Sequence, residues 1–433
     1  MKISDFSRYG LGIGAGIAML AGCGGSQVPM GPVSGKDAAV MRQALLTDQP
    51  TGTHHFRAFY TFESGTDGAN PRAGLVALNG TLYGTTGIGG GYCGSTGCGT
   101  IFSVSTSGQE KVLYSFKGGN ADGFLPSAAL VAVNGVLYGT TTYGGTGCQH
   151  YGGGGCGTVF SVTTVGAEKI LHLFTAGADG GEPSANLVAV GGLLYGTTEL
   201  GGCGQCNGCN DGQLFPGCGT VFSVSASGKE KVLYSFMGGT DGIVPIAGLV
   251  VVKGVFYGAT INGGAYGYGT VFSATASGQE KVLYSFKGGT DGDRPWGGMI
   301  YLNGNLYGTT VSGGTGCGSG PGCGTVYSIS TSGKEKVLYR FKGASDGAGP
   351  AASLIAVKGV LYGSTQFGGT YPCDGGTVFS ITTSGQEKML RRLNCGTDGA
   401  FPWALIDLNG VLYGTSFGGV TDNLYGTVFR LLP

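Results

Sequence analysis

The chain has 433 residues, of which 94 are glycine, 41% are apolar and only 11% are charged. This apolar content is enough to bury a core, so the glycine does not indicate disorder, and the lack of a G-x-y period excludes collagen. Basic and acidic side chains number 24 each, which excludes a phosphate-tracking surface, so we expect no nucleic-acid partner.

The first 22 residues are predicted to be a signal peptide rather than part of the fold. Lys2 and Arg8 precede the run LGIGAGIAMLAG, which is too short to span a bilayer as a helix. The run ends in Leu-Ala-Gly-Cys23, which resembles the lipobox of bacterial lipoproteins. That resemblance implies cleavage before Cys23, lipidation of its thiol and anchoring in a bacterial envelope. Gly24 in place of aspartate favours the outer membrane or cell surface. An ordinary secretory signal is the alternative.

Residues 23–54 are polar, with scattered Gly and Pro, and are predicted to be a flexible membrane tether. From residue 55 to 433 four phrases recur seven times in a fixed order. They are LYGTT-like, GTVF-like, KVLYSF-like and an Asp-Gly pair followed by Pro. The tyrosines of the first phrase run from Tyr83 to Tyr413, a mean spacing of 55 residues because 330 residues span six intervals. Such a period is typical of repeat architectures.

Each repeat is predicted to hold four short strands, a to d, which in the second repeat cover 130–133, 136–141, 158–162 and 169–174. They are rich in Val, Leu, Tyr, Phe and Thr. Asn-Gly, Gly-Gly or Lys-Gly between a and b supplies the positive φ of a tight hairpin. Strands b and d lack clean alternation, which is typical of sheets covered on both faces. Seven such antiparallel units predict an all-β, seven-bladed β-propeller, with an open array or a β-helix as alternatives.

The phase of the repeat predicts that the ring is closed by its two ends. The chain begins this domain with a lone strand d, FRAFYTF at 56–62, and ends with a, b and c at 404–431. We expect the N-terminal strand to complete the last blade, because this pairing removes an exposed sheet edge.

The four phrases together resemble the GloVer tandem-repeat proteins, which are bacterial surface proteins with varying membrane anchors. The resemblance covers residues 55–433 and implies a propeller-like fold and a cell-surface location, with the lipobox as this chain's anchor. It implies no activity. Because LYGTT recurs in every blade, its residues are predicted to be structural. The Asp-Gly pairs are predicted to cap turns rather than to bind calcium, since each loop repeats a single carboxylate.

Alternate connections of an antiparallel unit lie at opposite ends, so the b–c and d–a loops are expected to share one face, called here the long-loop face. The b–c loops vary from 8 to 20 residues, so function is expected there. Apart from Cys23 the chain has twelve cysteines, an even number that predicts disulfides in an oxidising compartment. The candidates are Cys93 with Cys98, Cys148 with Cys156, Cys317 with Cys323, the cluster Cys203, Cys206, Cys209 and Cys218, and Cys373 with Cys395 on the same face.

The spacing within the 203–218 cluster leaves its connectivity open. Cys-x2-Cys spacing would also suit zinc or an iron–sulfur cluster, but for a secreted chain two disulfides are the prediction. We therefore expect neither a metal nor a cofactor.

Residues that break the sevenfold pattern are the candidates for a binding site. Trp296 and Trp403 each follow the proline before strand a and are expected at the channel mouth. There the tryptophan rings would stack against a sugar ring, and Arg72, Asp293 and Asp211 are the candidate polar residues beside them. The alternative is that both tryptophans only cover the end of the core. Other asymmetric acids on this face are Glu182, Glu199 and Asp422, and His172, which replaces a strand-d tyrosine, is predicted to be packing.

No Ser/His/Asp set, His-x-x-x-His pair or phosphate-cradling motif in the right context occurs in the sequence, so no catalytic residue and no enzyme activity are predicted. The sequence favours a monomeric, lipid-anchored binding module with a glycan or protein ligand on the long-loop face. Two alternatives stay open. One is a carbohydrate-active enzyme, a lyase or hydrolase, with acids around the channel, and the other is a structural surface protein without a specific ligand.

Overall fold

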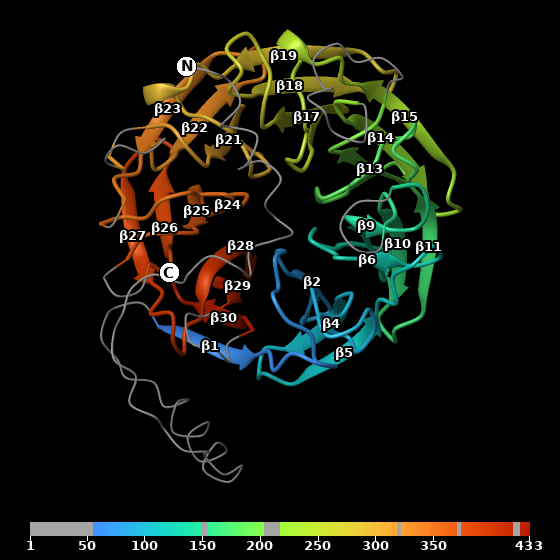
Figure 1. The fold of residues 1–433 in the computed structure, drawn as a ribbon. Coiled ribbons are helices and arrows are strands. Elements are labelled where there is room, and N and C mark those ends of the chain that lie inside the picture. Colours follow the sequence, from blue (N-terminus) through green and yellow to red (C-terminus); the bar gives the residue numbers. More distant parts are fainter. Residues whose placement is uncertain are drawn as a thin grey trace, which may run out of the picture.

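The computed structural model describes residues 55–148, 154–202, 217–314, 316–317, 322–343, 345–369, 374–418 and 425–433. Seven four-stranded antiparallel sheets surround a central axis, which confirms the seven-bladed propeller (Figure 1). Blades 1 to 6 follow one another from residue 76 to residue 392, and blade 7 joins residues 400–431 to the N-terminal strand. Within the described part of the chain, no helix has the length and apolar character needed to cross a membrane.

Every blade repeats the same four strands from the axis to the rim. The innermost strands a are β2 (Val76–Leu78), β7 (Val131–Val133), β12 (Val188–Val190), β16 (Val250–Val252), β20 (Ile300–Leu302), β24 (Ile355–Val357) and β28 (Ala400–Leu408). Strands b are β3 (Thr81–Thr86), β8 (Val136–Thr141), β13 (Leu193–Thr198), β17 (Val255–Thr260), β21 (Asn305–Thr310), β25 (Val360–Thr365) and β29 (Val411–Gly418).

The outer half of each blade consists of strands c and d. Strands c are β4 (Thr100–Ser105), β10 (Thr158–Thr163), β14 (Thr220–Ser225), β18 (Thr270–Thr275), β22 (Thr325–Ser330), β26 (Thr377–Thr382) and β30 (Thr427–Leu431). Strands d are β5 (Glu110–Ser115), β11 (Glu168–Leu173), β15 (Glu230–Ser235), β19 (Glu280–Ser285), β23 (Glu335–Arg340), β27 (Glu387–Arg392) and β1 (Phe56–Thr61). Minor elements are the paired strands β6 (Gly123–Phe124) and β9 (Tyr143–Gly144) and the 3-10 helices η3 (Gly239–Asp241) and η4 (Gly289–Asp291).

The recurring LYGTT and GTVF phrases form the contact between strands b and c. Strand b needs its glycine because a Cβ atom at Gly139 would lie 2.7 Å from the ring of Phe160 on strand c. The last threonine of strand b meets the first of strand c, and the hydroxyls of Thr141 and Thr158 are 2.8 Å apart. A hydroxyl pair of this kind recurs in every blade. These phrases are therefore structural, as predicted.

The hydrophobic core lies between neighbouring blades. In one cluster Phe174 of blade 2 packs edge-on against Phe222 of blade 3, with 5.1 Å between ring centroids. Strands b and c are almost fully buried, whereas strands d are half-buried with an exposed second residue, Lys169 in blade 2. The expected coverage of both faces thus holds for strand b but only in part for strand d, because strand d forms the rim and meets solvent.

The aspartate of each Asp-Gly pair fastens two neighbouring blades. Asp122 accepts hydrogen bonds from the backbone nitrogen of Lys117 and from the hydroxyl of Tyr114, both at 2.8 Å, which confirms the predicted capping. Glu168 of the next blade lies beside it, and burial, together with the Asp122 charge, raises the pKa of Glu168 to about 7. We call this arrangement a carboxyl clasp. The others with tyrosine are Tyr60/Asp67/Glu110, Tyr234/Asp241/Glu280, Tyr284/Asp291/Glu335 and Tyr339/Asp346/Glu387.

Two of the seven blade junctions replace the tyrosine. Between blades 2 and 3, His172 Nε2 lies 3.4 Å from Asp179 Oδ2, so this histidine takes part in the clasp as well as in packing. Between blades 6 and 7, Arg391 pairs with Asp398 at 2.5 Å, and its guanidinium lies 4.7 Å from the centroid of the Phe56 ring. The junction between blade 6 and blade 7 is therefore held by an ion pair and by a cation–π contact to the N-terminal strand.

Strand β1 completes blade 7, as predicted. It pairs antiparallel with β30 from Phe56 opposite Leu431 to Thr61 opposite Thr427. The backbone nitrogen of Phe62 then donates a hydrogen bond to the carbonyl of Gly426 at 3.0 Å. The pairing covers the edge of β30, which would otherwise be exposed.

A stability gain is expected from Tyr327→Phe. Tyr327 occupies the strand-c position of blade 5 where the other six blades have phenylalanine. Its side chain is fully buried, and its hydroxyl has no hydrogen-bond partner among the described residues. Because an unsatisfied buried hydroxyl costs about 1–3 kcal/mol, the change should raise the free energy of unfolding by about 1 kcal/mol in a urea titration. The reverse change, Phe272→Tyr, is the matched control and should lower it; equal stability of all three proteins would contradict this account.

Candidate functional site

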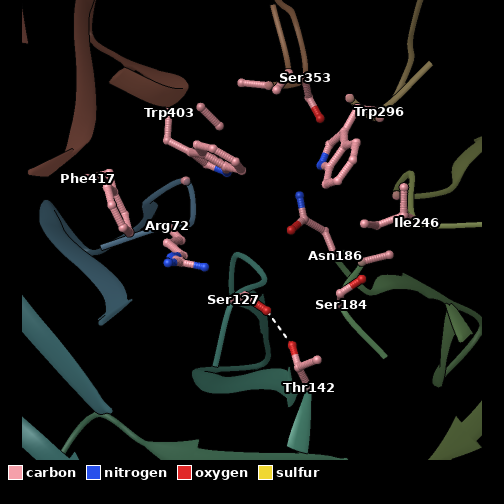
Figure 2. Close-up of a pocket in the computed structure, with 18 of the residues that line it drawn as sticks. Arg72, Ser127, Thr142, Ser184, Asn186, Ile246, Trp296, Ser353, Trp403 and Phe417 are labelled. Atoms are coloured by element: carbon pink, nitrogen blue, oxygen red, sulfur yellow. Dashed lines mark hydrogen bonds between the residues drawn. The ribbon is translucent and has the colours of Figure 1, made fainter. Parts of the chain in front are cut away.

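The central channel opens into a cavity of about 450 Å³ on the long-loop face (Figure 2). The d–a loops of blades 1 to 6 and the equivalent first part of β28 in blade 7 contribute lining residues, and segments that follow strand b contribute others. The two classes of loop therefore share one face, as predicted from the alternation of the strands.

Three positions of the repeat provide most of the lining. Two of them flank the repeated proline that precedes strand a, and are called the pre-proline and post-proline positions. The third follows the last residue of the LYGTT phrase and is called the post-strand-b position. The post-proline residues all line the cavity: Arg72, Ser127, Ser184, Ile246, Trp296, Ala351 and Trp403. The post-strand-b residues that line it are Thr142, Glu199, Val311, Gln366 and Phe417, and the pre-proline residues are Leu125, Glu182 and Phe401.

The backbone fixes these positions in the same way in each blade. The pre-proline residue Glu182 has φ of +56°, as the corresponding residues of the other blades also have positive φ. Its nitrogen donates to the carbonyl of Cys156 in the preceding blade at 2.6 Å, and its carbonyl accepts from the nitrogen of Glu199 at 3.3 Å. Because backbone atoms make these bonds, the side chains can differ from blade to blade without changing the scaffold.

Aromatic side chains form one arc of the cavity. Trp296 of blade 5 and Trp403 of blade 7 both present their indole rings to its centre (Figure 2). Beside them the guanidinium of Arg72 lies 4.4 Å from the centroid of the Phe417 ring. Burial lowers the pKa of Arg72 from its ordinary value, although the group stays cationic at neutral pH.

Polar groups of blades 2 and 3 form the facing arc. The hydroxyls of Ser127 and Thr142 are hydrogen-bonded at 2.5 Å (Figure 2). The carbonyl oxygen of Asn186 accepts a hydrogen bond from the nitrogen of Ala129 at 2.7 Å, which leaves the amide nitrogen of Asn186 as a donor toward the cavity. Convergent polar groups within a cavity that also has a large apolar and aromatic surface are typical of ligand-binding sites.

The acids of the lining are Glu182 and Glu199, both on blade 3. Burial, reinforced by the charge of Glu199, raises the pKa of Glu182 to about 8. Burial also raises the pKa of Glu199 to about 7, although the neighbouring Ser184 hydroxyl works against the rise. No other blade has a carboxyl side chain at the pre-proline, post-proline or post-strand-b position.

Three of the predicted ligand residues, Trp296, Trp403 and Arg72, come together at this cavity. Asp293 does not line it: this residue stands one position before the pre-proline residue, pairs with the backbone of Ser312 and lies 3.6 Å from the Nε of Arg294. The predicted acids Asp211 and Asp422 lie outside the described residues.

The sequence reasoning did not select Asn186, and it did not single out Glu182 and Glu199 from the other acids. The signal that could have found them was present. When the seven repeats are written in register, the positions around the proline and after strand b differ between blades, whereas their neighbours repeat.

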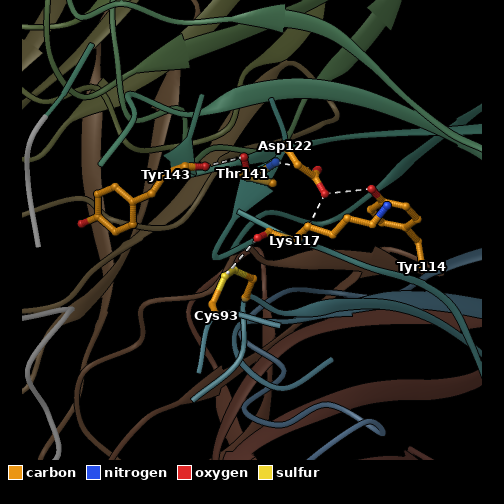
Figure 3. The surroundings of a disulfide bond; sticks show 8 residues. Cys93, Tyr114, Lys117, Asp122, Thr141 and Tyr143 are labelled. Carbon is orange, nitrogen blue, oxygen red and sulfur yellow. Dashed lines mark hydrogen bonds between the residues drawn. A yellow bond between two sulfur atoms is a disulfide. The ribbon is translucent and has the colours of Figure 1, made fainter. Parts of the chain in front are cut away.

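Disulfide bonds cross-link the loops behind the cavity. The pairs Cys93–Cys98, Cys148–Cys156 and Cys317–Cys323 are bonded as predicted. Figure 3 shows the first, where Cys93 Sγ lies 3.4 Å from the carbonyl oxygen of Lys117. The carbonyl of Cys98 accepts a hydrogen bond from the nitrogen of Leu125, a cavity residue of the next blade, so the bridge steadies the backbone behind the site.

The remaining cysteines are described only in part. Cys218 and Cys395 are each disulfide-bonded. Their candidate partners Cys203, Cys206, Cys209 and Cys373 lie outside the described residues, so the connectivity of the 203–218 cluster stays a prediction. The described residues contain no group of three or more side chains suited to hold a metal ion.

Residues 45–215 and 203–429 each match the Gloeobacter/Verrucomicrobia repeat. The chain belongs to this repeat family. The two matches together span most of the sequence and confirm the family membership that the four recurring phrases predicted. No curated protein matches the chain by sequence.

Three solved structures are similar to this chain at low identity. A gluconolactonase from Xanthomonas campestris has 13% identity and a TM-score of 0.39, with 64% of this chain and 79% of that chain covered. A luciferin-regenerating enzyme has 14% identity and a TM-score of 0.43, and the match covers 88% of this chain and 95% of that chain. The tricorn protease has 10% identity and a TM-score of 0.42, and the match covers 80% of this chain but 27% of the tricorn chain. Similarity at this level assigns no activity.

Proposed function

We propose that this protein is a lipid-anchored surface protein that binds a glycan in the cavity of the long-loop face. The observation that carries the proposal is that the only two tryptophans of the chain face the same cavity (Figure 2). Aromatic rings supply large, rigid contact area at binding sites, and their faces suit the apolar faces of sugar rings. A cavity of about 450 Å³ is in the size range of small-ligand sites.

The tryptophans are not needed by the scaffold. Ser127 and Ala351 occupy the same post-proline position in blades 2 and 6, so the blade closes without an indole there. Trp296 and Trp403 are also only partly buried, which leaves ring surface open to the cavity. These facts favour ligand contact over the alternative that the rings merely cover the core.

The location also forms part of the proposal. Three intact disulfides suit an oxidising compartment outside the cytosol. Lipidation of Cys23 would attach the protein to the outer membrane, and residues 24–54 would then act as the tether. With the ring at the end of this tether, the long-loop cavity would be accessible to glycans at the cell surface.

The test is a glycan-binding screen on the purified protein, followed by titration calorimetry with the tightest ligand. Trp296→Ala and Trp403→Ala should each weaken binding about 10- to 100-fold, because loss of a central aromatic contact costs about 1.4–3 kcal/mol. Tyr266→Ala is the control, since Tyr266 is an exposed loop aromatic that does not line the cavity. Unchanged affinity in a folded Trp296/Trp403 double variant would refute the site.

The same samples decide between binding and catalysis. Chromatography of the glycan after long incubation with the protein should show no cleavage. Turnover that a single substitution, Glu182→Gln or Glu199→Gln, abolishes would instead establish the alternative of a carbohydrate-active enzyme.

A further inference from the structure

We propose that the cavity recognises an amino sugar with a free ammonium group, and that Glu182 and Glu199 together receive this ammonium. The inference rests on the proposed glycan site and names the class of sugar that it takes. It is carried by a one-sided pair of carboxyl groups within an aromatic cavity.

Glu182 is a largely buried carboxyl group that no described residue neutralises. Its side chain is 6% exposed and lines the cavity, and among the described residues no hydrogen bond or ion pair is made to its carboxyl oxygens. Ionising a carboxyl group in such surroundings, without donors or a cation, is unfavourable. A ligand that brings positive charge and N–H donors to this point would remove that penalty.

The described residues supply no cation to the pair. The ionisable groups that line the cavity are Arg72, Tyr143, Glu182 and Glu199. Arg72 belongs to blade 1 and is stacked on Phe417 of blade 7, whereas the two acids belong to blade 3. Burial raises the pKa of both glutamates, and no neighbouring cation acts against the rise. At neutral pH the empty pair therefore retains protons that a bound cation would displace.

The geometry favours holding a cation over cleaving a glycosidic bond. Glycoside hydrolysis places its two carboxyl groups on either side of the bond to be broken. Here the backbones of Glu182 and Glu199 are hydrogen-bonded to each other at 3.3 Å, so both side chains arise from one wall. The indole faces of Trp296 and Trp403, on blades 5 and 7, add a surface that attracts cations.

The test compares two sugars that differ in charge, the trisaccharide of glucosamine and that of N-acetylglucosamine. Titration calorimetry near pH 6, where the free amino sugar already carries its proton and the carboxyl pair is still protonated, is run in two buffers of different ionisation enthalpy and measures both affinity and protons released. The glucosamine sugar should bind at least 10-fold tighter, with release of a fraction of a proton up to about one, because its ammonium ionises the carboxyl pair. The acetylated sugar should bind without proton release.

Variants identify the groups responsible. Glu182→Gln and Glu199→Gln should each weaken binding of the amino sugar about 10-fold and reduce proton release, and should weaken binding of the acetylated sugar much less. Asp293→Asn is the matched control, because this acid lies on the same face outside the cavity and should change neither value. Thermal unfolding of each variant verifies that it is folded.

Each other result has a distinct meaning. Equal affinity for both sugars, or glutamine variants that bind the amino sugar as wild type does, would overturn the inference and leave the glycan site intact. Failure of both trisaccharides, with another glycan bound in the screen, would also overturn the inference alone, whereas a screen without any glycan ligand would remove the proposed function as well. Cleavage lost in Glu182→Gln would assign the pair to acid–base catalysis and overturn the binding role.

Discussion

Raising the pH from 5 to 8 should lower the free energy of unfolding of this protein by several kcal/mol. The cause is the ring of carboxyl clasps, in which a glutamate of one blade lies beside the aspartate of the preceding one. Burial, together with this like charge, raises the pKa of Glu110, Glu168 and Glu335 to about 7 and that of Glu280 to about 8. The pKa values of Glu230 and Glu387 are raised for the same reasons.

The direction follows from where the protons are bound. Between the unfolded pKa of a glutamate and its raised folded value, the folded protein holds a proton that the unfolded chain has released. The contribution of a clasp is therefore fully present below about pH 4.5 and is lost as the pH rises through about 7 to 8. Since these glutamates are partly solvent-exposed, screening reduces each contribution to on the order of 1 kcal/mol.

Urea unfolding at pH 5, 6, 7 and 8, at constant ionic strength and with the disulfides intact, measures the effect. Glu280→Gln provides the control, because glutamine keeps the shape of the side chain without its charge. This variant should match wild type at pH 5 and exceed it in stability at pH 8. A wild-type protein that is equally or more stable at pH 8 would disprove the role assigned to the clasps.

Replacing Phe62 by alanine should lower the free energy of unfolding by about 3–5 kcal/mol, the range for large aromatic truncations in a core. Phe62 directly follows β1 and is 1% exposed. Its ring packs edge-on against Phe102 of blade 1, with 5.0 Å between centroids. The change leaves a cavity at the junction of blades 7 and 1. It also removes a packing contact of the N-terminal segment whose strand, β1, closes the ring.

Denaturant unfolding monitored by circular dichroism tests this expectation. Arg57→Ala, an exposed position on the same strand, is the control and should change stability by less than about 0.5 kcal/mol. If Phe62→Ala cost under 1 kcal/mol, the N-terminal strand would not be an integral part of the ring, and closure by β1 would contribute little to the fold.

The blade pattern could be read from the sequence because each of its signals is local and is repeated seven times. Turn pairs such as Asn134-Gly135, which adopt the positive φ of a tight hairpin, marked the a–b connections. The lone strand predicted at 56–62 indicated that the N-terminal segment completes the last blade. The prediction that both faces of strand d are covered was only partly correct. A run of apolar and aromatic residues does not show that one strand of each blade lies at the rim and meets solvent.

The number of blades, the closing strand and the three loop disulfides that the structure describes could all be predicted from the sequence, because each depends on residues that are near in sequence or repeated by period. Which side chains share the cavity became clear only from the folded ring. Asp293 is three residues from Trp296 and yet lies outside it, whereas Trp403 comes from two blades further along the chain and faces the same space. This difference arises because a ring brings equivalent positions of distant repeats around one axis, whereas adjacent residues of an extended loop point in different directions.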